Sequence, residues 1–123
     1  MLAVAEHAGI HSEIIPRIAT GFCSGIARTG GLCGAVSGGI MGISLCLGRN
    51  TPTDSVDPCY QAVKLFLERF STQFGALSCQ ELTGVHLGTP EGQAAFKEKG
   101  QIKLCTRYAG EAARMVVEIL EST

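Results

Sequence analysis

The sequence has few of the side chains that usually recognise nucleic acids. Tryptophan is absent and aromatic residues make up only 6% of the 123 residues, so few rings are available to stack on bases. Ten Lys and Arg residues stand against eleven Asp and Glu residues, and the formal net charge is -1. Without a basic excess there is no electrostatic basis for phosphate binding, and we expect no nucleic-acid partner.

A secretion signal and a convincing membrane span are also missing. The opening MLAVAEHAGI has no basic region before its apolar residues and no cleavage site, so we expect a cytoplasmic protein. Residues 29–48 form twenty uncharged positions, about the length of a bilayer span. Seven of these are glycine, which lowers the hydrophobicity. We expect a buried core helix and no membrane partner, and keep a membrane helix pair as an alternative.

The common catalytic motifs are absent as well. There is no C-x-x-C pair, which argues against a zinc ribbon or a thioredoxin-type site. The glycines of 30–42 do not follow G-x-G-x-x-G and no strand precedes them. What the chain does have is six cysteines and 16 glycines. In the cytosol, abundant thiols favour metal binding or redox chemistry over structural bridges.

The pattern of apolar residues predicts an all-α fold. No segment alternates as a strand does, whereas apolar residues recur at helical spacing. We expect one domain over 1–123, a bundle of about five or six helices with one glycine-rich buried helix. The expected helical segments are 2–10, 12–27, 32–47, 57–75, 79–84, one opening at Thr89-Pro90, and 101–121.

Local signals fix several helix ends. Asp57 as N-cap with Pro58 at the first position is a preferred helix start, Gly75 is a preferred stop, and Ser78-Cys79-Gln80-Glu81 is a capping box. The helix expected over 12–27, with Ser12 as its N-cap, is predicted from the periodicity of its apolar residues alone. Its expected buried face consists of Ile14, Ile15, Ile18, Ala19 and Phe22.

The glycines of the helix over 32–47 need an explanation. Four of them, Gly34, Gly38, Gly39 and Gly42, each cost about 1 kcal/mol against alanine in a helix interior. Close helix packing is the interpretation we favour for Gly38, Gly39 and Gly42. For Gly34, backbone access to a bound group is an equally good explanation.

Two cysteines lie at predicted helix starts. Cys33 falls in the first turn of the helix over 32–47, and Cys79 directly follows the N-cap Ser78. Free N–H groups and the helix dipole favour a thiolate there and lower the thiol pKa. The alternative is that both are compact buried residues. By position alone, Cys105, Cys46 and Cys59 are structural, and Cys23 stays ambiguous.

The residues around Cys33 resemble a known family. Residues 33–38 read C-G-A-x-x-G, preceded by Gly21-Phe22 and by 28–31, and followed by S-C-Q-E-L-T-G at 78–84 and by Cys105. The chain is similar, over nearly its whole length, to the C-GCAxxG-C-C family of redox-active proteins. This resemblance implies that Cys33, Cys79 and Cys105 are the second, third and fourth family cysteines, and it makes Cys105 a site residue.

The resemblance carries further implications. Family members tend to be encoded near oxidoreductase or transporter genes, which implies an oxidoreductase or electron-transfer partner. Some carry twin-arginine export signals, which hints at a prosthetic group such as an iron–sulfur cluster. The first family cysteine would lie just upstream of Met1, and we expect the natural chain to begin earlier. If that cysteine is truly absent, Cys23 is its replacement.

The sequence thus predicts a redox site at which Cys33, Cys79 and Cys105 converge. They would form a thiol–disulfide centre, or ligate a metal or iron–sulfur centre with Cys23 and Gly34 nearby. Four thiolates are the usual complement for a cluster, so three favour the thiol–disulfide form. The alternative from another class is a non-catalytic helical module with structural cysteines, whose glycine face forms a homodimer.

Overall fold

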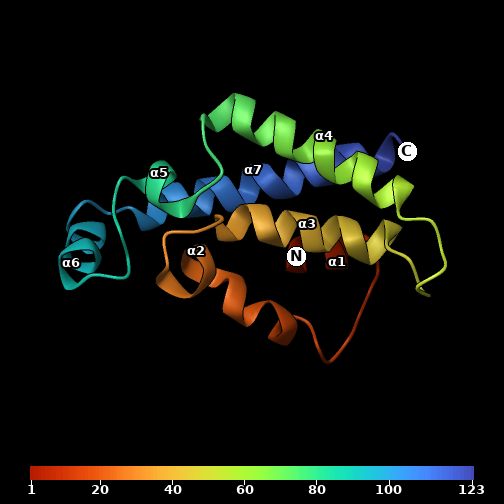
Figure 1. Cartoon of the computed structure of the whole chain (residues 1–123), viewed down its shortest axis with the longest axis horizontal. Helices are drawn as coiled ribbons and strands as arrows, with labels where there is room; N and C mark the ends of the chain where they lie inside the picture. Colours follow the sequence, from red (N-terminus) through yellow and green to blue (C-terminus); the bar gives the residue numbers. More distant parts are fainter.

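The computed structural model describes all 123 residues and confirms the all-α fold. Three long helices, α3 (Gly34–Leu47), α4 (Asp57–Phe74) and α7 (Ile102–Glu121), pack against one another in all three pairs (Figure 1). The short α5 and α6 lie at one end of this bundle. The remaining bounds are α1 Leu2–His7, the 3-10 helix η1 Arg17–Phe22, α2 Cys23–Arg28, α5 Cys79–Thr83 and α6 Pro90–Glu98.

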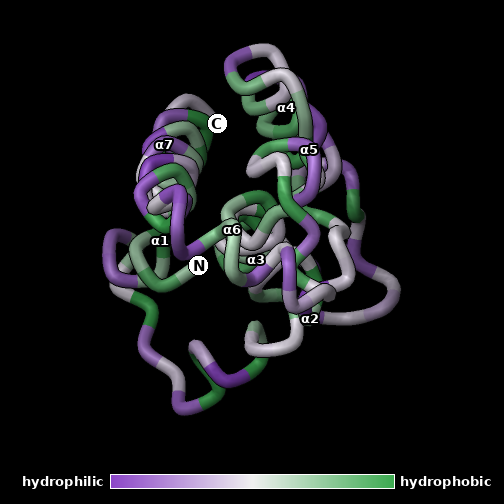
Figure 2. The backbone as a smooth tube through the Cα atoms, turned by 90° about the vertical axis from the view of Figure 1, so that its left-hand side faces the viewer, coloured by the Kyte–Doolittle hydropathy of each residue, from purple (hydrophilic) through white to green (hydrophobic).

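The core forms where the apolar faces of the long helices meet. Its largest fully buried side chains are Phe66 and Phe70 of α4, Val36 and Ile43 of α3, Val116 and Ile119 of α7, and Val4 of α1. Burying side chains of this size contributes about 1.5–3 kcal/mol each. Figure 2, seen along the bundle, shows α3 lying close to both α7 and α4. The glycine-rich helix is therefore central, as the sequence predicted.

The glycines of α3 allow this close packing. A Cβ on Gly39 would overlap the ring of Phe66, and a Cβ on Gly42 would lie 3.0 Å from Val4 of α1. At Gly38 it would lie 3.2 Å from the backbone nitrogen of Met1. The packing role predicted for these glycines is confirmed, and they serve two neighbours: α1 at Gly38 and Gly42, and α4 at Gly39.

The capping signals place most helix ends correctly. The Ser78 hydroxyl accepts a hydrogen bond from the Glu81 amide at 3.2 Å, and Gly75 and Gly84 end their helices in the left-handed conformation. Asp57 is the first residue of α4 rather than its N-cap, which is Val56. The helix predicted over 32–47 begins two residues later, because 31–33 pair with another segment before the helix starts.

The continuous helix predicted over 12–27 is wrong. The chain forms a turn, then η1, then the turn labelled α2, in which Ser24–Arg28 all have positive φ. Pro16 offers no N–H to a helix, and a 3-10 helix repeats every three residues, so the expected face is not formed. Ile14, Ile18 and Phe22 are accordingly 56%, 59% and 42% exposed.

The left-handed turn of α2 is costly for side chains with a Cβ. Each non-glycine residue in this conformation costs on the order of 1–2 kcal/mol relative to the right-handed helix. Four such residues, Ser24, Ile26, Ala27 and Arg28, adopt it in succession around Gly25. Contacts made by the turn must offset this strain, and they lie at the site described below.

None of the helices has the length and apolar character that crossing a membrane requires. The apolar run over 29–48 contributes only 14 residues to α3, fewer than the roughly 20 that a bilayer span needs.

Candidate functional site

A two-stranded contact holds the starts of α3 and α5 side by side. Leu32 and Ser78 form an isolated antiparallel bridge. The Cys33 amide donates to the Leu77 carbonyl at 2.8 Å, and the Cys79 amide donates to the Gly31 carbonyl at 2.7 Å. Cys33 is the N-cap of α3 and Cys79 is the first residue of α5. The bridge thus brings these two cysteines together from positions 46 residues apart in the sequence.

Cys105 reaches the same region from the start of α7. It shares one face of α7 with Gln101 and Tyr108, four residues before it and three after it. The side-chain amide of Gln101 donates to the Thr83 carbonyl at 3.0 Å, and the Tyr108 hydroxyl donates to the Leu82 carbonyl at 3.1 Å. These two bonds tie this face of α7 to the end of α5, and Cys105 lies between them.

The three cysteines line one cavity of about 310 Å³. It lies at the end of the bundle where α5 and α6 approach the starts of α3 and α7 (Figure 1). Cys33 is 8% exposed, Cys79 is 6% exposed, and Cys105 is half-buried. All six cysteines of the chain are free thiols. The structure therefore brings together the three cysteines that the sequence selected.

The left-handed turn of α2 covers this cavity from one side. A Cβ on Gly25 would overlap the Cys79 side chain, and the φ of Gly25 is +66°. The Gly25 carbonyl accepts hydrogen bonds from the Gly31 amide at 2.9 Å and from the Thr29 hydroxyl at 3.1 Å. The strained turn thus places bare backbone directly against the thiol of Cys79, where only glycine fits.

The electrostatics of the cavity keep Cys79 and Cys105 protonated. Burial raises the pKa of Cys79, the negative charge of Cys33 raises it further, and the Thr83 hydroxyl partly opposes this. Burial also raises the pKa of Cys105, again assisted by the charges of Cys33 and then Cys79. A thiolate on Cys33 therefore disfavours ionisation of its two neighbours.

The lowered pKa predicted for Cys79 is wrong. Its helix, α5, has only five residues, so it supplies a much weaker dipole than a full-length helix. The thiol is buried as well, and removal from water disfavours its charged form. Burial outweighs the helix start here.

A known protein family matches nearly the whole chain. The model of the family described as "Putative redox-active protein (C_GCAxxG_C_C)" matches residues 1–119. The chain belongs to the C_GCAxxG_C_C family. The predicted resemblance is confirmed, and with it the assignment to a class of redox-active proteins. The chain matches no curated protein and no solved structure.

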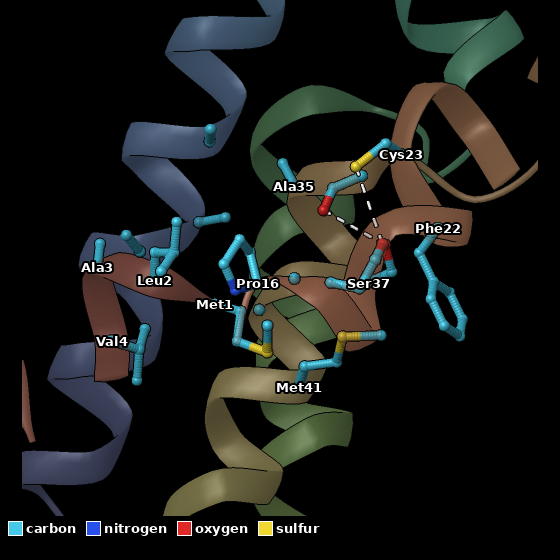
Figure 3. Close-up of a pocket in the computed structure, with 17 residues that line it drawn as sticks. Met1, Leu2, Ala3, Val4, Pro16, Phe22, Cys23, Ala35, Ser37 and Met41 are labelled. Atoms are coloured by element: carbon cyan, nitrogen blue, oxygen red, sulfur yellow. Dashed lines mark hydrogen bonds between the residues drawn. The ribbon is translucent and has the colours of Figure 1, made fainter. Parts of the chain in front are cut away.

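The cysteine suggested as a replacement for the first C_GCAxxG_C_C position lies elsewhere. Cys23 lines a second groove, between α1, η1, α3 and α7, and does not line the three-cysteine cavity (Figure 3). Its thiol is exposed and donates a long hydrogen bond, 3.8 Å, to the Ala19 carbonyl. Gly34 lines both hollows, and a Cβ there would meet the Cys23 Cα at an ordinary 3.8 Å. Close approach of a bound group to Gly34 thus remains a prediction.

The other two cysteines differ from each other. Cys59 packs partly buried against the core, 3.7 Å from the Ser44 hydroxyl, as expected of a structural residue. Cys46 is exposed, so its predicted structural role is wrong. The small-residue row of α3 meets α1 at Gly38 and Gly42, and this contact does not extend to Cys46 near the helix end.

The donor set does not fit a metal ion in this conformation. No three Cys, His, Asp or Glu side chains are placed so that they could hold one ion. The three thiols share the cavity but do not form such a group.

Several residues of the cavity were missed by sequence reasoning. Arg28 and Lys97 line it, as do Thr83 and Tyr108. Tyr108 could have been found from its helical spacing to Cys105, three residues earlier. Arg28 and Lys97 carry no such signal, because they come from separate turns that only the tertiary structure brings near the cysteines.

Proposed function

We propose that the chain is a two-electron thiol–disulfide redox protein whose reactive centre is Cys33 with Cys79 and Cys105. The observation that carries this proposal is that three free thiols from three helices line one cavity. The charge of Cys33 acts on both of the others, after burial, in the direction that keeps them protonated. Several free thiols that line one cavity are the components that disulfide exchange needs.

The reaction begins on Cys33. Its sulfur, at the N-cap of the 14-residue α3, attacks one sulfur of a disulfide substrate and forms a mixed disulfide. The leaving sulfur takes a proton and departs as a thiol. A neighbouring cysteine then loses its proton and attacks the Cys33 sulfur. The second half of the substrate leaves as a thiol, and the protein keeps both cysteines as a disulfide. One substrate disulfide is reduced as two protein thiols are oxidised.

Cys33 is the sulfur common to every oxidised form in this proposal. The charge of Cys33 is the second-largest cause, after burial, of the raised pKa of Cys79 and of Cys105. For the raised pKa of Tyr108 it is the third-largest cause, after burial and the charge of Cys105. We therefore take Cys33 as the attacking residue of the proposal. We expect an intramolecular disulfide of Cys33 with Cys79 or Cys105, and none between Cys79 and Cys105.

A protein of this kind needs a partner and a suitable compartment. An oxidoreductase that returns the disulfide to two thiols would complete the cycle. We place the protein in the cytoplasm, where the reducing thiol pool keeps cysteines free between turnovers.

Thiol counting and disulfide mapping test the proposal. The reduced protein has six thiols and, after equilibration with a mild oxidising dithiol buffer, should retain four. Peptide mapping should locate the missing pair at Cys33 and one of its two neighbours. Cys33→Ser should abolish the intramolecular disulfide, whereas Cys46→Ser, at an exposed cysteine outside the cavity, should form it normally.

Three results would overturn the proposal. One is six thiols surviving oxidation, which would leave the cysteines without redox function. Another is a disulfide that excludes Cys33. The third is stoichiometric iron or zinc in anaerobically purified protein together with protected thiols, which would favour the metal-site form.

The dimerising helical module receives less support. Its glycine face is already used within the chain, since Gly39 packs on Phe66 and Gly42 packs on Val4. A second copy could not approach these glycines without displacing α4 or α1. Homodimer formation stays a prediction that this glycine ridge does not explain.

A further inference from the structure

The three-cysteine cavity is lined by two cations and no anion. Arg28 comes from the end of the left-handed turn, and Lys97 comes from the last turn of α6. Both are exposed on the rim of the cavity. None of its lining residues is Asp or Glu, although the chain as a whole carries one more acidic than basic residue. The local charge therefore differs in sign from the net charge of the protein.

Neither cation has a partner within the chain. The ion pairs of the structure join His7 to Glu121, Arg69 to Glu118, and Arg114 to Glu111 and Glu118. Arg28 and Lys97 instead leave their charges available at the opening of the cavity.

The position of Arg28 is maintained at an energetic cost. Its φ is +66°, in the left-handed region that disfavours residues with a Cβ by about 1–2 kcal/mol. The same turn brings Gly25 against Cys79, so Arg28 is held close to the thiols by the backbone that covers them. Strained backbone of this kind is concentrated at ligand and active sites.

We infer that the substrate of this cavity is a small disulfide that carries carboxylate groups, bound by Arg28 and Lys97 while Cys33 attacks its sulfur. This inference rests on the proposed function. A cavity of about 310 Å³ lies at the small end of ligand sites and suits a low-molecular-weight disulfide, or one half of it, rather than a folded protein surface. Arg pairs with carboxylates in a bidentate manner, and Lys adds a second charge.

The atoms and electrons of the reaction balance with this substrate. The carboxylates stay on the rim and take no part in bond making. The Cys33 sulfur bonds to the nearer substrate sulfur as the substrate S–S bond breaks, and the released half leaves as a carboxylate-bearing thiol. A second protein cysteine displaces the other half in the same way. The products are two such thiols and one protein disulfide.

Three matched disulfides test the inference on the reduced full chain. The probes are 3,3'-dithiodipropionate, which is a dianion, bis(2-hydroxyethyl) disulfide, which is neutral, and cystamine, which is a dication. Each rate of exchange is divided by the rate of 2-mercaptoethanol with the same disulfide, which removes intrinsic differences in reactivity. At low salt the normalised rate should be about tenfold higher for the dianion than for the neutral disulfide, and lowest for the dication.

Measuring the same rate ratio in variants and at high salt distinguishes binding by Arg28 and Lys97 from a general effect of the protein's charge. Arg28→Gln and Lys97→Gln should each lower the dianion-to-neutral ratio about threefold, as expected for exposed charge pairs. Lys64→Gln, at an exposed cation on α4 remote from the cavity, should leave the ratio unchanged. At about 1 M salt, where the screening length is about 3 Å, the ratio should approach one.

The possible failures are distinguishable. Exchange with all three disulfides at equal normalised rates, or a ratio insensitive to both substitutions, would overturn the substrate assignment while leaving the thiol–disulfide function intact. Absence of exchange with every probe would overturn the proposed function itself.

Discussion

The hydroxyl of Tyr108 donates a hydrogen bond to the carbonyl oxygen of Leu82, 3.1 Å away, and thereby joins α7 to α5. The same tyrosine packs its ring edge-on against Phe74, with ring centroids 4.8 Å apart. One side chain therefore connects the aromatic core to the wall of the three-cysteine cavity. Any change at Tyr108 should affect both the stability of the bundle and the position of Cys105.

Tyr108→Phe tests this connection. The ring stays, but the Leu82 carbonyl loses its donor, and the free energy of unfolding should fall by about 1 kcal/mol. Urea denaturation of the reduced protein measures the change. Tyr60→Phe is the matched control, because Tyr60 is 57% exposed, and its effect should stay within about 0.5 kcal/mol. Equal effects of the two substitutions would show that the hydroxyl of Tyr108 makes no net contribution.

The left-handed turn predicts an unusual sign for a glycine substitution. Ala27 has a φ of +52° and is exposed, so Ala27→Gly should relieve strain and raise the free energy of unfolding by about 1 kcal/mol. Ala94→Gly, at an exposed position inside α6, should lower it by about 1 kcal/mol, as in an ordinary helix. Thermal unfolding of the two variants compares the signs directly. Destabilisation by both would argue against the left-handed turn.

Much of the helical framework follows from local chemistry. Caps such as Ser78 with Glu81, and stops such as Gly75 and Gly84, act on adjacent residues, so the sequence reveals them without knowledge of the tertiary fold. The helix predicted over 12–27 was wrong because Pro16 offers no N–H to a helix and Ser24–Arg28 adopt positive φ, and neither feature changes the apolar spacing. Periodicity alone could not distinguish these outcomes.

The site was predictable only in part. The family pattern selected Cys33, Cys79 and Cys105 by position. Cys33 and Cys79 meet through a single bridge between Leu32 and Ser78, whereas Cys105 joins them through the bonds that tie the start of α7 to α5. One bridge is too short to produce an alternating strand pattern. The same limit applies to Arg28 and Lys97, whose proximity to the thiols arises from the left-handed turn and from α6. Interactions between residues distant in sequence, rather than local propensity, set the charge of the cavity.

The raised thiol pKa values predict loss of stability at alkaline pH. Burial first, and the Cys33 charge second, raise the pKa of Cys79 above its ordinary value of 9.0. Near that pH the unfolded chain releases the proton while the folded chain still holds it. The folded state then binds more protons, so the free energy of unfolding falls as pH rises. The stability contribution of the protonated thiol is fully present below the unfolded pKa.

Denaturant titrations between about pH 7 and 10 on reduced protein measure this slope. Cys79→Ser should flatten it, since serine has no ionisation in this range. Cys46→Ser should leave it unchanged, because the Cys46 thiol is exposed and free. A slope that is the same in all three proteins would contradict a raised pKa at Cys79.

Replacing Gly39, in the middle of α3, by alanine should destabilise the protein. Replacing Gly110 in α7 by alanine is the control, and it should change the free energy of unfolding in the opposite direction. Gly39→Ala adds a Cβ that overlaps the ring of Phe66, which is fully buried in the core. Overpacking should outweigh the better helix propensity of alanine and lower the free energy of unfolding by about 2 kcal/mol. Gly110→Ala, on the exposed face of α7, meets no atom within 4 Å and should raise it by about 1 kcal/mol.

In the double variant Gly39→Ala with Phe66→Leu, the smaller side chain should make room for the new methyl group. The combined loss should then be smaller than the sum of the single losses. Purely additive losses would mean that the glycine does not serve the contact with Phe66, and the packing argument for the glycine-rich helix would fail with it.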